Sequence, residues 1–398
     1  MIIKPRIKGF MCATSHPSGC AMDVQRQVDY VVSQGQISNG PARVLIIGAS
    51  GGYGLASRIS AAFGSNAATI GVFFERPAKK THTASPGWYK SAAFAELATE
   101  EGLYAKNING DAYSEEVKRA TIALIKEDLG QVDLVVYSLA APARQLSDGS
   151  VVRGTLKPIG EPYDGMTINI NSGELRAVSL EPANPEEVAD TVKVMGGEDW
   201  EGWIAAMLEA GVLADGCITT NYTYLGSKVT WPIYNHGTIG KAKEDLDRAA
   251  MALKEPMSGV NGRAQVVVMK GVLTQAASAI PGMPVYISLL FKAMKQAGTH
   301  EGCIEQTTRL FATRLFSPGN PGTDDEGRIR MDDLELADDI QAYINDKWSD
   351  VNSTTQSDLA DFEGYCQAFM ELYGFGFDGA DYEADVDPAW EMELVPSG

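Results

Sequence analysis

Apolar and polar positions along this chain follow two alternating patterns. Short apolar runs, most of them rich in β-branched residues, are typical of strands buried on both faces of a sheet. These runs lie at 42–48, 68–75, 103–110, 132–140, 216–226 and 263–271. Most segments between them follow helical periodicity instead. Such alternation predicts an α/β fold with a doubly wound parallel sheet, whose ligands lie at the carboxyl ends of the strands.

Helices are expected at 54–64 and 114–130, and in the second Ser114 is a suitable N-cap followed by two acidic residues. No repeat and no composition break divides the chain, so we expect one large domain spanning 1–398. Two stretches exceed a minimal nucleotide-binding fold and are interpreted as insertions: 76–100 and 141–216.

The first predicted strand runs directly into a glycine-rich loop, GASGGYGLASR. Glycines let the backbone turn tightly and approach a pyrophosphate, whose charge suits a helix N-terminus. A plain strand-to-helix turn is the alternative, but the loop lies within one βαβ unit, which favours dinucleotide binding in a Rossmann-like fold. The expected cofactor contacts in this loop are Gly48, Ala49, Ser50, Gly51, Gly52 and Tyr53.

The second strand ends in an acidic residue, Glu75, within VFFERP. A carboxylate here can accept hydrogen bonds from the adenosine ribose and would repel a 2′-phosphate, which predicts NADH/NAD rather than NADPH. Arg76 could instead receive that phosphate, and Glu75 could simply be solvated. Further cofactor contacts are expected where the second, third and fourth strands end: Phe74, Asp111, Ala112, Leu139 and Ala140.

The segment NYTYLGSKVTWPIYNHGTIGKAKEDLD, residues 221–247, contains tyrosines and lysines suited to polarising a carbonyl beside a nicotinamide. Lys243 shares a helix face with Ile239 and Leu246, whereas Lys241 lies beside Glu244. Lys243 is therefore expected to point inward, where a ribose and a tyrosine oxygen would satisfy its charge. The alternative is that its aliphatic stem follows the apolar stripe to water.

Spacing then selects the tyrosine. The Tyr-x-x-x-Lys pattern of short-chain dehydrogenases is absent, and a Tyr-x6-Lys pairing of Tyr234 with Lys241 conflicts with the helical phase. The remaining pattern is Tyr-x8-Lys, formed by Tyr234 and Lys243. A nearby ammonium would make the tyrosine proton easier to give. His236, two residues after Tyr234, is expected to be structural rather than catalytic.

Motifs along nearly the whole chain resemble one family, the trans-2-enoyl-CoA reductases, which include the enoyl-acyl-carrier-protein reductases of the FabV type. The motifs that carry this resemblance are GFMCATSHPSGC, GASGGYGLASRI, FFERP, SPGWY, INGDAYS, DLVVYSLAAP, TLKPIG, VMGGEDW, YTYLG, YNHGTIGKAKEDL, LTQAASAIPGMPVYISLLFKAMKQAGTHEGCIEQ and YGFGFDGADYEADV. THEGCIEQ and the Tyr-x8-Lys unit are the most specific.

The resemblance implies NADH-dependent reduction of the carbon–carbon double bond of trans-2-enoyl thioesters in fatty acid metabolism. It implies an extended short-chain dehydrogenase/reductase fold in which Tyr234 donates a proton, Lys243 contacts NAD and Tyr224 contacts the substrate. It also implies that Glu75 discriminates NADH from NADPH. Three further cofactor contacts are implied by it: Leu273, Thr274 and Gln275.

An apolar segment at 276–300 is expected to line the acyl pocket, although an ordinary core helix is the alternative from composition alone. Gly282 and Met283 depart from the family pattern there and leave the acyl chain length open. The apolar candidates for the pocket are Ile280, Met283, Val285, Tyr286, Leu289, Leu290, Phe291 and Met294.

A net charge of −19 argues against a nucleic-acid or anionic-membrane partner. The densest acidic runs, 332–339 and 378–387, are interpreted as solvated faces. Five cysteines without CxxC predict reduced thiols in a cytoplasm, and the four histidines lack metal-ligand spacing, so no metal is expected. No signal peptide or membrane span is predicted, and we expect a monomer.

Two other functions share the glycine loop. A carbonyl or ketoacyl reductase of the short-chain type would want Tyr-x-x-x-Lys and an upstream serine, and a non-catalytic NAD sensor has no need of Tyr234 with an inward Lys243. The carrier of the acyl thioester stays open between coenzyme A and acyl carrier protein. The acidic balance argues mildly against an acidic carrier protein unless a local basic patch exists.

Overall fold

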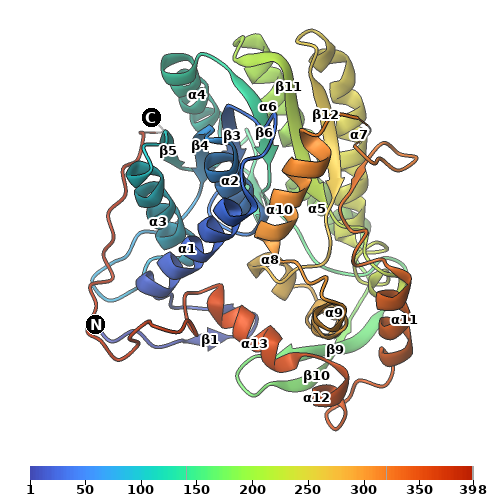
Figure 1. Ribbon diagram of the computed structural model, residues 1–398. Helices are drawn as coiled ribbons and strands as arrows, with labels where there is room; N and C mark the ends of the chain where they lie inside the picture. The colour runs from blue at the N-terminus through green and yellow to red at the C-terminus, as the bar shows by residue number, and fades with distance from the viewer. Residues whose placement is uncertain (140, 320, 397–398) are drawn as a thin grey trace.

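A seven-stranded parallel sheet forms the centre of the molecule, in a computed structural model that describes residues 1–396 apart from 140 and 320 (Figure 1). Its spatial order is that of a Rossmann fold, with the first and fourth strands side by side. From edge to edge the strands are β13 (Ile329–Arg330), β12 (Arg263–Val268), β11 (Leu213–Thr223), β6 (Val132–Tyr137), β3 (Arg43–Ile47), β4 (Ala68–Phe73) and β5 (Ala105–Asn109). The doubly wound sheet predicted from the sequence is confirmed.

The chain reverses direction across the sheet between β3 and β6. Ile47 pairs with Val72 on one side and with Tyr137 on the other, so β3 lies at the centre. Its residues from Val44 to Ile47 are fully buried, which explains the unbroken apolar run. Ligands bind at such a reversal, outside the carboxyl ends of the strands.

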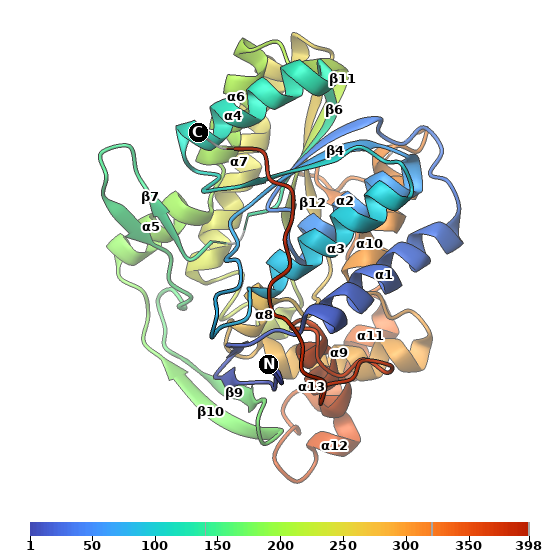
Figure 2. The same ribbon diagram turned by 90° about the vertical axis from the view of Figure 1, so that its left-hand side faces the viewer.

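Helices cover both faces of the sheet (Figure 2). On one face lie α1 (Pro17–Gln34), α2 (Gly52–Ser65), α3 (Pro86–Glu100) and α10 (Cys303–Leu310), the last continued by a π-helical turn, Phe311–Leu315. On the other face lie α4 (Glu115–Leu124), α6 (Glu198–Glu209) and α7 (Thr238–Ser258), with α5 (Pro185–Met195) outside α7. Ser114 caps α4 as expected, but the last turn of the predicted helix, Ile125–Leu129, is a π-helix.

The two stretches interpreted as insertions differ in content. Within 76–100, α3 connects β4 to β5 and is the crossover helix of that unit, so only the preceding loop is additional. Within 141–216, α6 connects back to β11 in the same way. The additional elements there are α5 and two hairpins: β7 (Ala143–Gln145) with β8 (Val151–Arg153), and β9 (Tyr163–Asn169) with β10 (Glu174–Leu180).

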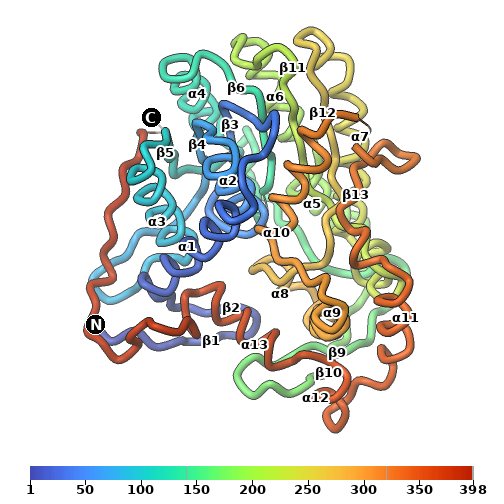
Figure 3. The backbone as a smooth tube through the Cα atoms, viewed as in Figure 1, coloured from blue at the N-terminus to red at the C-terminus, as the bar shows by residue number. Residues whose placement is uncertain are grey.

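A second layer of helices lies at the carboxyl end of the sheet (Figure 1). Its centre is α9 (Met283–Ala297), which contacts β9, α11 and α13. Around it lie α8 (Gln275–Ser278), α11 (Asp338–Lys347), α12 (Gln356–Leu359) and α13 (Phe362–Glu371). The short hairpin of β1 (Ile7–Lys8) and β2 (Met11–Cys12) runs beside α13 (Figure 3).

The C-terminal tail crosses back over the cofactor-binding half. Trp88 Nε1 donates to the Trp390 carbonyl at 2.8 Å, and Val395 N donates to the Asn107 carbonyl at 2.8 Å. Asn107 belongs to β5, so the tail covers the outer edge of the sheet.

All five cysteines are free thiols. Within the described ranges, no helix has both the length and the apolar character that crossing a bilayer requires.

Candidate active site

The glycine-rich loop at the end of β3 turns too tightly for other residues. Gly48 has φ +90°, and a Cβ on it would lie 2.1 Å from the Ser138 carbonyl oxygen. A Cβ on Gly54 would lie 1.9 Å from the Gly48 carbonyl oxygen. A Cβ on Gly51, by contrast, would meet nothing within 4 Å. The loop is therefore packed on its inner side and open on the side where a ligand would approach.

The N-terminus of α2 opens onto this same space. Gly51 is its N-cap and supplies no side-chain acceptor, so the first-turn N–H groups remain available. Uncapped N–H groups and the helix dipole together suit a pyrophosphate. Ala49 is fully buried beneath the loop, and the Tyr53 hydroxyl donates to the Lys270 carbonyl at 3.0 Å. The residues present fit a dinucleotide.

Glu75 lies against the loop, as the ribose hypothesis requires. Its Oε1 accepts a hydrogen bond from Ser50 Oγ at 2.7 Å, and its backbone is held by the Asn109 side chain. A Cβ on Gly87, in the first turn of α3, would lie 2.0 Å from Glu75 Oε1. Gly87 thus makes room for the carboxylate. Phe74 is 78% exposed, with its ring free to lie against a ligand.

The expected contacts after β5 and β6 lie at the same edge of the sheet. Asp111 accepts a hydrogen bond from Tyr113 N at 3.0 Å and shapes the turn before α4. Ala112 is buried, and its carbonyl accepts from Trp203 Nε1 at 3.0 Å. Leu139 is partly buried beyond β6. Ala140 lies outside the described residues.

Tyr234 is held by the start of α7. Its carbonyl accepts from the N–H groups of both Gly237 and Gly240 at 3.1 Å. A Cβ on Gly240 would come within 2.7 Å of that carbonyl oxygen, so this close approach needs glycine. The Tyr234 ring meets Tyr224 edge-on, with centroids 4.9 Å apart. Both side chains are buried, and within the described part of the chain the Tyr234 hydroxyl makes no hydrogen bond.

The two lysines of α7 face opposite ways. Lys243 points inward, and its Nζ donates to the Tyr222 carbonyl at 3.1 Å. Lys241 is exposed and pairs with Glu244 at 2.8 Å. The helical-phase argument is therefore confirmed for the direction of both side chains. Burial lowers the Lys243 pKa to about 8, against a weaker opposing effect of Asp247.

The expected help from Lys243 to the Tyr234 proton is not present in this geometry. Burial raises the Tyr234 pKa above its ordinary value, because the phenolate would lack solvation. The Lys243 ammonium is directed to Tyr222 instead of the Tyr234 oxygen. Tyr234 is therefore a neutral hydroxyl donor at neutral pH.

A buried carboxylate that sequence reasoning missed lies behind Tyr224. Glu335 has no exposed surface, and its Oε1 accepts from the hydroxyls of Tyr224, at 2.9 Å, and Tyr286. Its Oε2 accepts from Gly271 N at 2.5 Å. Burial raises the Glu335 pKa, while these donors and the Lys270 ammonium oppose the rise.

Glu335 belongs to the acidic run 332–339, so the interpretation of that run as a solvated face is wrong for this residue and for Asp332, which is 1% exposed. Tyr224 was a candidate for substrate binding, and a buried tyrosine hydroxyl needs a hydrogen-bond acceptor. The need for an acceptor near Tyr224 was the one signal in the sequence that pointed to a buried acidic residue.

Comparison with known proteins identifies the family to which the chain belongs. A family model described as "Trans-2-enoyl-CoA reductase catalytic region" matches residues 82–316, and the "NAD(P)H binding domain of trans-2-enoyl-CoA reductase" matches residues 2–80. The chain belongs to the trans-2-enoyl-CoA reductase family. A third model, "Enoyl reductase FAD binding domain", matches residues 323–386. In this family member that segment supplies Glu335 and the helices α11, α12 and α13, of which α11 and α13 contact α9.

Relatives cover the chain from end to end. "Enoyl-[acyl-carrier-protein] reductase [NADH]" of Serratia proteamaculans is 56% identical over 396 residues, 99% of each chain. The solved trans-2-enoyl-CoA reductase of Treponema denticola, in complex with NAD, is 44% identical with a TM-score of 0.94, over 99% of this chain and 100% of that one. The Clostridium acetobutulicum enzyme, in complex with NADH, is 41% identical with a TM-score of 0.95, over 98% of each.

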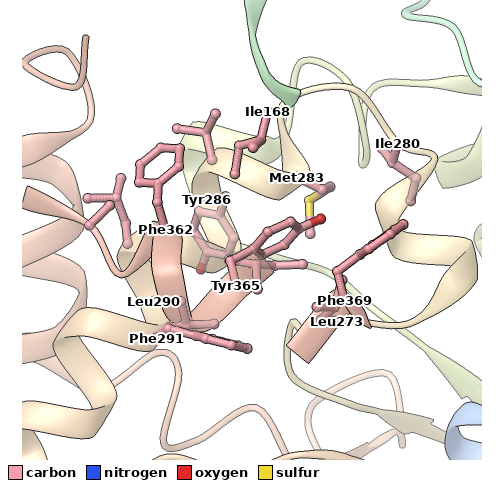
Figure 4. Packing of buried hydrophobic residues seen from close by; sticks show 14 of the residues in the cluster. Ile168, Leu273, Ile280, Met283, Tyr286, Leu290, Phe291, Phe362, Tyr365 and Phe369 are labelled. Atoms are coloured by element: carbon pink, nitrogen blue, oxygen red, sulfur yellow. The ribbon is translucent and has the colours of Figure 1, made fainter. Parts of the chain in front are cut away.

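The apolar segment expected to line the acyl pocket of this reductase forms α8, a turn and α9. Its apolar side chains are buried in one cluster with Tyr224, Tyr234 and Leu273. Figure 4 shows part of this cluster, including Leu273, Met283 and Leu290. Helix α13 covers it with Phe362, Tyr365 and Phe369. A Cβ on Gly282, in the turn before α9, would lie 2.3 Å from the Tyr163 hydroxyl of β9.

The three cofactor contacts implied by the resemblance also lie here. Thr274 caps α8 and approaches the cradle, since its Cγ2 is 3.4 Å from a Cβ built on Gly52. Leu273 is buried beside the tyrosines, and Gln275 is exposed at the start of α8.

Proposed function

We propose that this protein reduces the carbon–carbon double bond of trans-2-enoyl thioesters with NADH. The observation that carries the proposal is the buried ring of Tyr234, whose hydroxyl has no hydrogen-bond partner among the described residues, at the same end of the sheet as the uncapped N-terminus of α2. One feature provides a proton donor in a dry apolar site, and the other provides a place for a dinucleotide. The family of the chain and the names of its relatives support the same reaction.

The cofactor would be held from both ends. The N–H groups of α2 and the glycine loop bind the pyrophosphate, and Glu75 accepts hydrogen bonds from the adenosine ribose. Lys243 holds the hydroxyls of the nicotinamide ribose, and Thr274 lies beside the loop. When bound, NADH supplies the hydride that the β-carbon of the substrate accepts.

Tyr234 stabilises the charge that develops on the thioester oxygen as the double bond is reduced. A hydroxyl aimed at such an oxygen in a water-excluded site typically contributes about 100- to 1000-fold in rate. Burial keeps Tyr234 protonated, so the donor is present throughout the neutral pH range. The cluster around α9 provides an apolar site for the acyl chain.

Tyr224 has a different part in this site. It has one hydroxyl proton, and that proton is donated to Glu335. Tyr224 therefore has no second proton for the substrate, and its role is to position Tyr234 through the edge-on ring contact and to present oxygen lone pairs to the pocket.

The names of the relatives support a proposal for the carrier, and the free thiols support a proposal for the compartment. Relatives at 54–56% identity are named for acyl carrier protein, so we assign an acyl-carrier-protein thioester as the substrate. Free cysteines suit a reducing compartment such as the cytoplasm.

Steady-state consumption of NADH tests the function directly. Purified protein with NADH and crotonyl-CoA, a soluble enoyl thioester, should consume NADH. Consumption with acetoacetyl-CoA but not crotonyl-CoA would instead identify a ketoreductase. Tight binding of NADH without turnover of either thioester would identify a sensor.

A further inference from the structure

A cluster of exposed bases lies on two adjacent segments of this acidic chain, whereas other bases that are unpaired in the described structure, such as Arg119, Arg153 and Lys228, are scattered along the sequence. The net charge of the chain is −19. Yet no ion pair between described residues includes any of five exposed bases close to the N-terminus and after β4. These bases are Arg6, Lys8, Arg76, Lys79 and Lys80.

The two segments that carry these bases lie side by side. Ser15 N donates to Thr83 Oγ1 at 3.1 Å, and Ser15 Oγ donates to the Ala84 carbonyl at 2.6 Å. Lys79 and His82 are paired by two backbone hydrogen bonds of 2.9 and 3.0 Å, which hold the turn that presents Lys79 and Lys80.

Between the two segments lies a hollow of about 350 Å³, lined by Lys4, Arg6, Lys8, Thr14 and His82. We call this surface, with Lys79 and Lys80, the basic rim.

The acidic C-terminal segment neutralises one base of the basic rim, Lys4, and among the described residues forms no ion pair with Arg6, Lys8, Lys79 or Lys80. Glu383 pairs with Lys4, and Asp385 pairs with the terminal amine of Met1. Both acids are therefore occupied by partners outside the set of five unpaired bases.

The basic rim borders the apolar cluster around α9 that is proposed to receive the acyl chain. The β1–β2 hairpin touches α8, where Ser278 Oγ donates to the Phe10 carbonyl at 3.1 Å. The inner side chains of the hairpin segment, Ile3 and Cys12, belong to the same apolar cluster as Tyr224 and Tyr234. At the tip of the hairpin, Phe10 and Met11 are 50% and 49% exposed. Exposed aromatic and methionine side chains beside cationic ones are typical of protein-binding surfaces.

We propose that the basic rim docks an acidic carrier protein that presents the acyl thioester on a phosphopantetheine arm. This inference rests on the proposed function and adds the surface by which the carrier is recognised. Arg6 and Lys8 beside the hollow, together with Lys79, Lys80 and the tip of the hairpin, would meet acidic side chains of the carrier around the attachment point of the arm. The acyl chain would then enter the cluster behind the hairpin.

Screening by salt explains how an acidic carrier could dock on a protein with a negative net charge. At physiological ionic strength the Debye length is about 8 Å, so distant acids contribute little once the surfaces are in contact. An acidic partner that approaches one of the other faces comes close to these acids and is repelled there. The charge distribution therefore directs the carrier toward the basic rim.

The test is to measure reduction of the same enoyl chain attached either to acyl carrier protein or to coenzyme A. We would compare Arg6→Glu/Lys8→Glu and Lys79→Glu/Lys80→Glu with a matched control, Lys126→Glu/Lys254→Glu. The control bases are exposed and unpaired within the described structure, on segments leading into the starts of β6 and β12, at the opposite end of the sheet. Each rim variant should raise KM for the acyl-carrier-protein thioester about tenfold and flatten its salt dependence.

The same variants should reduce the coenzyme A thioester with kcat/KM within about twofold of the unaltered protein, which also shows that they fold. Equal losses on both carriers would overturn carrier docking in favour of a contact to the shared arm. Unchanged KM for the acyl-carrier-protein thioester in both rim variants would also overturn it. If the unaltered protein reduces neither thioester, the proposed function itself fails, which is a distinct result.

Discussion

The pKa of Lys243 predicts how the affinity for NADH changes with pH. Burial lowers this pKa from 10.5 to about 8. At 1.36 kcal/mol per unit, holding the ammonium in place without a ligand costs about 3 kcal/mol. Ribose hydroxyls that accept hydrogen bonds from the ammonium would offset much of that cost, so the pKa should rise again in the complex.

The sign of the effect follows from proton counting. Above about pH 8 the free protein has lost the Lys243 proton, and NADH binding must take one up. The dissociation constant for NADH should therefore rise as the pH increases beyond about 8, by up to tenfold per pH unit. In the absence of NADH, the folded protein loses the Lys243 proton above about pH 8, whereas the unfolded chain keeps it up to about pH 10.5. Because the unfolded state binds more protons between about pH 8 and 10.5, the contribution of Lys243 makes the free energy of unfolding rise with pH over that range.

Fluorescence titration of NADH across this range measures the dissociation constant, and calorimetry in two buffers of different ionisation enthalpy counts the protons. Lys243→Met should bind NADH more weakly and without the slope. Lys241→Met, on the exposed side of the same helix, should keep the slope of the unaltered protein. A slope that survives in Lys243→Met, or binding without proton uptake above pH 8, would refute the reasoning.

Three further predictions concern other groups. Tyr234→Phe should lower kcat about 100- to 1000-fold and leave the dissociation constant for NADH within about twofold, and full activity would reject its role as donor. Glu75→Ala should raise kcat/KM for NADPH relative to NADH about tenfold, and Gly87→Ala should act in the same direction by displacing the carboxylate; an unchanged ratio in both would leave Arg76 as the determinant. Glu335→Leu should lower the free energy of unfolding, measured with urea, by about 1–3 kcal/mol for each donor left without an acceptor, whereas Glu335→Gln should lose less.

The parts of the fold that the sequence predicted well are those with a regular pattern. The apolar run of β3 reflects a strand that is covered on both faces. The glycine loop after it reflects a turn that has no room for Cβ atoms. The direction of Lys243 followed from helical phase alone, because the apolar stripe of α7 is well defined.

Other features depend on segments that meet only in the folded chain. The first half of α3 is buried on nearly every side, between α1 and the C-terminal tail, so it lacks the polar face that marks a surface helix. Glu335 lies in an acidic run, and its tyrosine partners are more than forty residues away in the sequence. No local pattern distinguishes it from its solvated neighbours.

The covering of β5 by the last residues of the chain bears on how this protein is made and handled. An open strand edge can pair with another chain, and at the far side of the sheet β13 limits that hazard by being two residues long. On the β5 side the protection is supplied by the segment around Val395, which is far from β5 in the sequence. The nascent protein therefore exposes this edge until that segment has been synthesised, and deletions within the segment act on its solubility.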